Sequence, residues 1–367
     1  MAANGTVRFL DLSVDEAERR RYIAAIDKIL TSGMILNGPE VGDFEREVAA
    51  YCGANFAVGC GSGTAALYLA LKCMHIGPGD EVILPALSFV GTANAVTAVG
   101  AKPVFVDIRR DMLIDPDKIE EAITPRTKAI MPVHFNGTVC DMDALRAISE
   151  RRAIPIVEDA APAFGAVYRG RKAGTFGPVG CFSMNPMKVL GGIGEAGIVI
   201  AETEALAERL NELRYHGMRN KEVCIDVSLN ARLDTIQAAV LSIRLQSIEA
   251  NLKRRAEIAQ RYAAHLSNVV EVPRVPDDSR SAWYSYAILC DRRDALAKAL
   301  LSQGIECKIY HPTLMPDHPA HAGDVSHLSV GRGVVDQILC LPVYEKFSNA
   351  DVDRVSEAVV SFYGRAA

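Results

Sequence analysis

Ser-Met-Asn-Pro-Met-Lys-Val-Leu-Gly-Gly is the sequence of residues 183–192, and it is the most informative stretch of the chain. It places Lys188 five residues after a hydroxyl, Ser183, two residues after a proline and shortly before two glycines. Proline fixes the backbone and glycine permits sharp changes of direction, so a lysine here lies in a constrained turn. A lysine held in this way indicates a chemical role rather than a solvated helix face.

A carboxylate that could work with this lysine lies upstream. Asp159 ends the apolar run 154–159, where a carboxylate needs a partner or a functional reason. One alternative is that Asp159 caps a following helix. A lysine together with a strand-end aspartate is what pyridoxal phosphate (PLP) chemistry requires, because the amine forms a Schiff base and the carboxylate keeps the pyridine nitrogen protonated.

The composition excludes several other classes of protein. The chain has 367 residues, 49% of them hydrophobic, and a formal net charge of -5, which implies no nucleic-acid or membrane surface. Its nine cysteines are scattered without a C-x-x-C pair, as expected for reduced thiols. No apolar run approaches the roughly 20 residues of a membrane span, and the N-terminus lacks a signal-peptide pattern. We therefore expect a soluble cytoplasmic protein.

Short β-rich runs alternate with segments of helical period over the first two thirds of the chain. The expected strands cover residues 56–58, 81–84, 103–107, 128–133, 154–159 and 197–201, and the expected helices include 64–73 and 91–99. Nearly continuous valine and isoleucine strands that alternate with helices are typical of a mostly parallel sheet covered on both faces. The fold class is therefore α/β.

The last third of the chain has a different order of expected helices and strands. Apolar residues at helical spacing predict one long helix over 234–266, and the segment 273–280, rich in proline and aspartate, predicts a surface turn. The expected elements after it are strand 283–290, helix 294–303, strands 305–309 and 335–341, and a helix capped near Ser348. We expect a large domain of residues 1–250 and a small α+β domain of residues 251–367. Packing of the N-terminal segment with the small domain is an alternative to its assignment to the large one.

A glycine-rich turn follows the first expected strand and opens a helix. Gly61, Ser62, Gly63 and Thr64 place free backbone N–H groups at a helix N-terminus, which favours a phosphate. A tight turn with a helix cap is one alternative. The nucleotide loop of methyltransferases that use S-adenosylmethionine is another, but the next strand ends at residues 84–87 without the acid that such enzymes need, and Lys188 would be left unused.

With these motifs the chain resembles, along almost its whole length, the PLP-dependent sugar aminotransferases of the DegT/StrS type, which have fold type I. The matching segments are residues 38–41, 44–45, 61–67, 78–82, 132–134, 158–161, 183–188, 214–217, 230–234, 237–239 and 341–344. The resemblance implies a large domain with a mostly parallel seven-stranded sheet flanked by helices. It also implies a homodimer with active sites at the interface.

The resemblance assigns roles to individual residues. Lys188 matches the lysine that forms the internal aldimine with PLP and shuttles a proton, and Asp159 matches the partner of the pyridinium nitrogen. Phe89 is placed where an aromatic side chain stacks on the ring. The expected contacts of the cofactor phosphate are Ser62, Gly63, Thr64 and Ser183. Asn230 matches a residue that reaches the phosphate of the neighbouring subunit's cofactor.

Several positions depart from the family's pattern. Pro162 stands where the family has a glutamine that hydrogen-bonds the cofactor's phenolic oxygen, and proline has no side-chain donor. Phe164 stands at a histidine position. The usual F-Y-P-T-K around the lysine becomes Met-Asn-Pro-Met-Lys over 184–188, and the usual G-D-G-G becomes Gly-Glu-Ala-Gly over 194–197. These changes affect the expectation for the substrate more than that for the fold.

The expected function is a transaminase that moves an amino group, from L-glutamate, onto the ketone of a nucleotide-linked or related sugar. Aminocyclitol aminotransferases and aromatic amine synthases of the aminohydroxybenzoate type share the lysine and remain alternatives, as does a non-catalytic PLP-binding regulator. His311, His318, His321 and His327 form a histidine-rich stretch whose spacing matches no zinc pattern. We therefore expect a solvent-exposed loop near the mouth of the site and no metal site.

Overall fold

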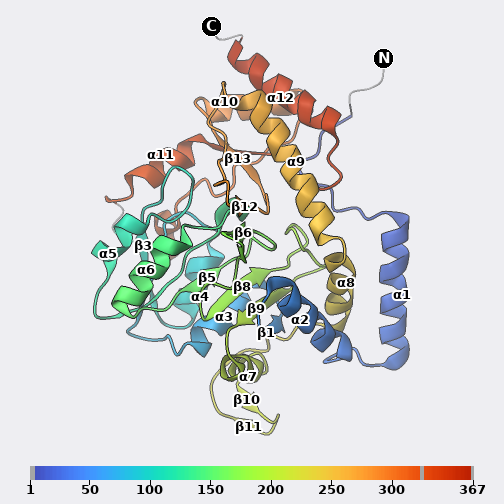
Figure 1. Cartoon of the computed structure of the whole chain (residues 1–367), viewed down its shortest axis with the longest axis vertical. Helices are drawn as coiled ribbons and strands as arrows, with labels where there is room; N and C mark the ends of the chain where they lie inside the picture. Colours follow the sequence, from blue (N-terminus) through green and yellow to red (C-terminus); the bar gives the residue numbers. More distant parts are fainter. Residues whose placement is uncertain (1–4, 323–325, 365–367) are drawn as a thin grey trace.

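The computed structural model describes residues 5–322 and 326–364 and has an α/β architecture (Figure 1). Two hydrogen-bonded sheets lie at its centre, with strand orders β1-β9-β8-β5 and β3-β2-β4. Their strands are β1 (Phe56–Cys60), β2 (Glu81–Pro85), β3 (Lys102–Val106), β4 (Thr127–Ile130), β5 (Val157–Asp159), β8 (Val179–Ser183) and β9 (Gly197–Ala201). All pairings are parallel except the two that involve β9.

The strands are thus divided between two sheets, where we expected one sheet of seven. Between β4 and β5 the pairing is reduced to isolated parallel bridges, Ile130 with Ile156 and Val133 with Asp159. Pro132 and Pro155 lie in this seam, and a proline has no N–H to give to a ladder. The backbone beside Asp159 is therefore held by separate contacts rather than by a continuous ladder.

Strand β9 shows that the four-stranded sheet is buried on both faces. Ile198 and Ile200 belong to one hydrophobic cluster, whereas Val199 and Ala201 belong to another. Alternate side chains of a strand point to opposite faces, so each cluster lies on its own side of the sheet. This explains why the strand reads as a continuous apolar run in the sequence.

Helices cover the sheets, and the remaining short strands form small separate sheets. The helices are α1 (Glu16–Ser32), α2 (Pro39–Cys52), α3 (Gly63–Cys73), α4 (Gly91–Ala98), α5 (Ile119–Ala122), α6 (Met142–Arg152) and α7 (Glu204–Leu213), with short 3-10 turns at Pro116–Lys118 and Phe135–Gly137. Helix α3 packs on α4, α7 and β8. Small strand pairs and triplets are β6 (Val167–Tyr168) with β7 (Arg171–Lys172) and β12 (Ser279–Arg280), and β10 (Met218–Arg219) with β11 (Val223–Cys224).

The single long helix expected over 234–266 is wrong. The structure has two helices, α8 (Thr235–Leu245) and α9 (Ile248–Leu266), separated at Gln246 and Ser247. Helix α8 packs against α1 and α2, whereas α9 packs against α12 (Asn349–Gly364), as Figure 1 shows. Hydrophobic periodicity did not reveal the break because both helices bury apolar side chains on either side of it.

The C-terminal part has its own buried cluster. Strands β13 (Tyr286–Leu289) and β14 (Ile338–Leu341) pair antiparallel, and α10 (Arg293–Ser302), α11 (Ser329–Gln337) and two 3-10 turns (Met315–Asp317, Pro319–His321) complete it. The expected strand over 305–309 is present only as single bridges at Ile305 and Lys308, and residues 335–337 end α11. Val7 belongs to this cluster and bridges Ile305, so the N-terminal segment packs here.

Two findings bear on the environment of the protein. Within residues 5–322 and 326–364, no helix is long and apolar enough to cross a membrane. The nine cysteines all lie in this part of the chain, and each is a free thiol.

Candidate active site

A cavity of about 690 Å³ lies beyond the carboxyl ends of β5 and β8 and beside the N-terminus of α3. Its lining includes all but one of the predicted site residues: Ser62, Gly63, Thr64, Phe89, Asp159, Pro162, Ser183 and Lys188. Asn230 stays outside it, exposed, and its side-chain oxygen accepts a hydrogen bond from Nε of Arg232 at 2.9 Å. Residues far apart in the sequence therefore meet at one site.

The turn that carries Lys188 is fixed by backbone hydrogen bonds. The Lys188 N–H donates to the carbonyl of Asn185 at 2.8 Å, and Gly192 N–H donates to the carbonyl of Met184 at 2.9 Å. Gly191 has no room for a side chain, because a Cβ there would lie 2.7 Å from the carbonyl oxygens of Asn185 and Pro186. The glycine that we noted in the sequence is therefore required by close backbone approach.

The amine of Lys188 lies over an aromatic ring. Its Nζ is 4.1 Å from the ring centroid of Tyr284, which stacks on Tyr310 at 6.0 Å with an interplanar angle of 4°. Burial lowers the pKa of Lys188 to about 8, although the carboxylates of Asp159 and Glu195 act in the opposite direction. A substantial fraction of the amine is therefore neutral, and so nucleophilic, at mildly basic pH.

Asp159 is a buried carboxylate, 3% exposed, with two donors on the protein side. The hydroxyl of Thr92 donates to Oδ2 at 2.7 Å, and the N–H of Ala161 donates to Oδ1 at 3.1 Å. Burial raises the pKa of Asp159, whereas these two bonds and the charge of Lys188 oppose that rise. Each oxygen keeps a further lone pair, so the carboxylate can still accept a hydrogen bond from a group in the cavity.

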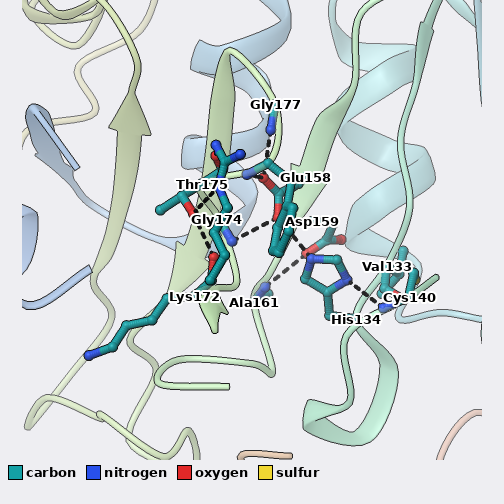
Figure 2. Close-up of polar contacts among 12 residues, drawn as sticks. Val133, His134, Cys140, Glu158, Asp159, Ala161, Lys172, Gly174, Thr175 and Gly177 are labelled. Atoms are coloured by element: carbon teal, nitrogen blue, oxygen red, sulfur yellow. Dashed lines mark hydrogen bonds and ion pairs between the residues drawn. The ribbon is translucent and has the colours of Figure 1, made fainter. Parts of the chain in front are cut away.

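A second, fully buried carboxylate holds the strand behind Asp159 (Figure 2). Oε2 of Glu158 contacts Nε2 of His134 at 2.9 Å and accepts the N–H of Gly174 at 2.7 Å. Oε1 accepts N–H groups from Phe176 and Gly177 at 2.5 and 2.9 Å. Since Nδ1 of His134 accepts the N–H of Cys140, the imidazole is neutral and donates to Glu158 through Nε2.

This network extends directly to Asp159. The N–H of His134 donates to the carbonyl of Asp159 at 3.0 Å, and the N–H of Asp159 donates to the carbonyl of Pro132 at 3.0 Å. Glu158 and His134 therefore fix both strands of the seam from which the Asp159 side chain projects.

The expected anion turn has the required geometry. Ser62 caps α3, its Oγ accepting the N–H of Ala65 at 3.1 Å, so the first N–H groups of the helix face the cavity rim. A Cβ at Gly63 would lie 2.5 Å from the Cβ of Ser183, so only glycine lets these two residues of the turn and of β8 meet. An amine, a buried carboxylate and an anion turn on one cavity fit PLP.

Of the side chains that the C-terminal part contributes, the two tyrosines were not predicted, whereas the histidine stretch was expected near the mouth of the site. Tyr284, Tyr310 and His311 line the cavity, and His311 lies 5.5 Å from Phe135 and 6.1 Å from Phe89 between ring centroids. Burial lowers the pKa of His311 to about 4, so its imidazole is neutral at pH 7. Thr92 was also missed, although a hydroxyl shortly after a strand end is a signal that could have identified it.

The other histidines of the stretch lie apart from the cavity. Nε2 of His321 contacts Oδ1 of Asn94 at 2.8 Å, and Nε2 of His327 contacts the carbonyl of Phe105 at 3.1 Å. In the described part of the chain, no three histidine, cysteine, aspartate or glutamate side chains are grouped to hold a metal ion.

The atypical residues occupy different surroundings. Pro162 lines the cavity beside Asp159. Phe164, at the usual histidine position, is buried and stacks on Tyr51 with centroids 5.2 Å apart. Asn185 and Glu195 also line the cavity, and Nδ2 of Asn185 donates to Oε1 of Glu195 at 2.6 Å.

Comparison with known proteins identifies the family of the chain. The chain belongs to the DegT/DnrJ/EryC1/StrS aminotransferase family, which matches residues 16–360. It is therefore an aminotransferase. The dTDP-3-amino-3,4,6-trideoxy-alpha-D-glucose transaminase of Streptomyces venezuelae is 41% identical over 360 residues, which cover 96% of this chain and 95% of the relative.

Solved structures share the fold. S. venezuelae DesV in complex with a ketimine intermediate has a TM-score of 0.95 at 40% identity and covers 98% of this chain and 99% of its own. NtdA from Bacillus subtilis, with the cofactor PMP bound, has a TM-score of 0.90 at 31% identity. The match covers 99% of this chain and 86% of the NtdA chain. The methyltransferase alternative is thereby set aside.

Proposed function

We propose that this chain is a PLP-dependent transaminase that moves an amino group from L-glutamate to the ketone of a nucleotide-linked sugar. The observation that carries the proposal is the meeting of Lys188, Asp159 and the Ser62–Gly63 turn on one cavity. The nucleotide-linked amino sugar in the name of the 41% identical relative supports the substrate class. PMP in the structure of the relative NtdA supports the cofactor.

Each polar group of the cavity has a defined task. Bound PLP supplies a ring that accepts electrons. Lys188 would hold the cofactor through Nζ, and its lowered pKa would let the same nitrogen take and return a proton. Asp159 would accept a hydrogen bond from the ring nitrogen, and its charge would favour the protonated form of that nitrogen. Ser183, Thr64 and the N-terminus of α3 would hold the phosphate.

The active unit is a homodimer, in which Asn230 reaches the phosphate site of the second subunit. Its position outside this chain's own cavity supports that role. Exposed apolar side chains between α1 and α2 (Met34, Ile35, Leu36) and near the cavity (Ile193) support burial against a second copy. We propose a division into a large and a small domain near residue 250, with the segment around Val7 packing on the small domain. The nine free thiols support a cytoplasmic location.

The function is tested with purified protein, PLP and a panel of keto compounds. L-Glutamate alone should convert the visible spectrum from the PLP to the PMP form. Glutamate plus a nucleotide-linked keto sugar, with 3-keto sugars tried first because the relative's name places its amino group at C3, should release 2-oxoglutarate continuously. A keto-inositol and an aminohydroxybenzoate precursor complete the panel. Turnover confined to either of these, or to an amino donor other than glutamate, would refute the proposal.

A further inference from the structure

Two polar side chains on the cavity wall beside Lys188 are bonded to each other. Nδ2 of Asn185 donates to Oε1 of Glu195 at 2.6 Å, and both residues line the cavity together with Lys188. Their segments are joined by a backbone hydrogen bond from the N–H of Met184 to the carbonyl of Ala196, at 2.8 Å. The backbone therefore brings the two side chains together.

The amide of Asn185 has one possible orientation. Its Oδ1 accepts the N–H of Met187 at 3.0 Å, so its NH₂ group must point away from the turn and toward Glu195. The carbonyl of Asn185 accepts the N–H of Lys188 at 2.8 Å. Asn185 thus connects the Lys188 turn to the Glu195 carboxylate by fixed contacts at both ends.

The charges around Lys188 leave Glu195 available to its amine. Asp159, at the end of β5, is bonded to Thr92 and Ala161. From the C-terminal part, Tyr284 presents its ring, and His311 is neutral because burial lowers its pKa to about 4. Glu195 is exposed on the cavity wall, and its charge raises the pKa of Lys188 against the effect of burial.

We propose that Glu195 is a positioning residue for Lys188, and that Asn185 acts by holding Glu195 in place. The Glu195 carboxylate, fixed on the cavity wall by Asn185, stabilises the protonated form of the Lys188 nitrogen. The proposal rests on the cofactor and the lysine of the proposed function, and it is independent of the sugar.

The test uses the holoenzyme and its visible absorbance as a function of pH, without glutamate or sugar. Glu195→Gln keeps the size and the acceptor for Asn185 but removes the charge. Because a carboxylate stabilises the protonated form of the Lys188 nitrogen, its removal should lower the pH midpoint of the absorbance change by roughly half a pH unit to one unit. Glu357→Gln, an exposed change on α12, is the matched control and should leave the midpoint unchanged.

A second variant separates positioning from a general structural role. Asn185→Ala should lower the midpoint in the native background and have no further effect when Glu195 is already Gln. An unchanged midpoint in Glu195→Gln, or an equal effect of Asn185→Ala in both backgrounds, would overturn the proposal. If Asn185→Ala does not fold, the comparison of Glu195→Gln with Glu357→Gln decides alone.

Failure of this proposal can be told apart from failure of the proposed function. A protein whose midpoint shifts as expected but which aminates no keto sugar would refute only the function. A protein that gives no visible absorbance with PLP would refute both.

Discussion

The cavity has a buried wall behind Asp159 and an open wall that carries Asn185 and Glu195. The two walls differ in how many of their polar groups have hydrogen-bond partners. Behind Asp159, Glu158 is 0% exposed and takes hydrogen bonds from His134 and three backbone N–H groups, as Figure 2 shows in part. On the other wall, Asn185 is partly buried and Glu195 is exposed. A fully matched buried network tolerates little change. On the open wall Asn185, Met187 and Glu195 depart from the family's pattern, and among the buried residues Pro162 and Phe164 depart from it as well.

Lys188 stands between the two walls, so its removal should have the largest effect. Lys188→Ala removes both the attachment of the cofactor and the proton carrier, and 2-oxoglutarate release should fall by at least about 10⁴-fold. Lys298→Ala, exposed on α10, is the control and should retain full activity. Normal turnover in Lys188→Ala would contradict the assignment of the site.

On the buried wall, Glu158→Gln should lower the free energy of unfolding by about 3 kcal/mol or more. A glutamine directs its NH₂ group at two of the donors that now face a carboxylate oxygen, so at least two hydrogen bonds are lost. Thermal unfolding followed by circular dichroism measures the change. Glu150→Gln, exposed on α6, is the control and should leave the midpoint temperature of unfolding unchanged. Similar midpoint temperatures for the two variants would mean that the network contributes little to stability.

The contrast also explains what the sequence could predict. Lys188, Asp159 and the Ser62–Thr64 turn lie at strand ends or in a turn with its own glycine, so local patterns and the family resemblance identify them. Tyr284 and Tyr310 reach the cavity from a part of the chain about 100 residues further on. No local pattern encodes that approach. The break between the two helices at Ser247 was missed because the apolar spacing continues across it. The division of the sheet was missed because it depends on the prolines in the seam between β4 and β5.

Thr92 tests the buried wall without removing a charge. Thr92→Val keeps the shape of the side chain but removes the hydroxyl that donates to Asp159. That bond opposes the effect of burial on the pKa of Asp159, so its loss should raise this pKa and move the acidic limb of the kcat/KM profile to higher pH. The rate below that limb should fall about tenfold. Thr97→Val, exposed on the same helix, is the control.

Pro162 lines the cavity at the position where the family has a glutamine, and it gives the smallest expected effect. Pro162→Gln supplies a side-chain donor for the cofactor's phenolic oxygen, which makes that oxygen less basic and weakens its hold on the proton shared with the Lys188 nitrogen. The midpoint of the visible absorbance should therefore move to lower pH, by less than about one unit. Superimposable titrations of the two proteins would mean that this wall does not need the glutamine.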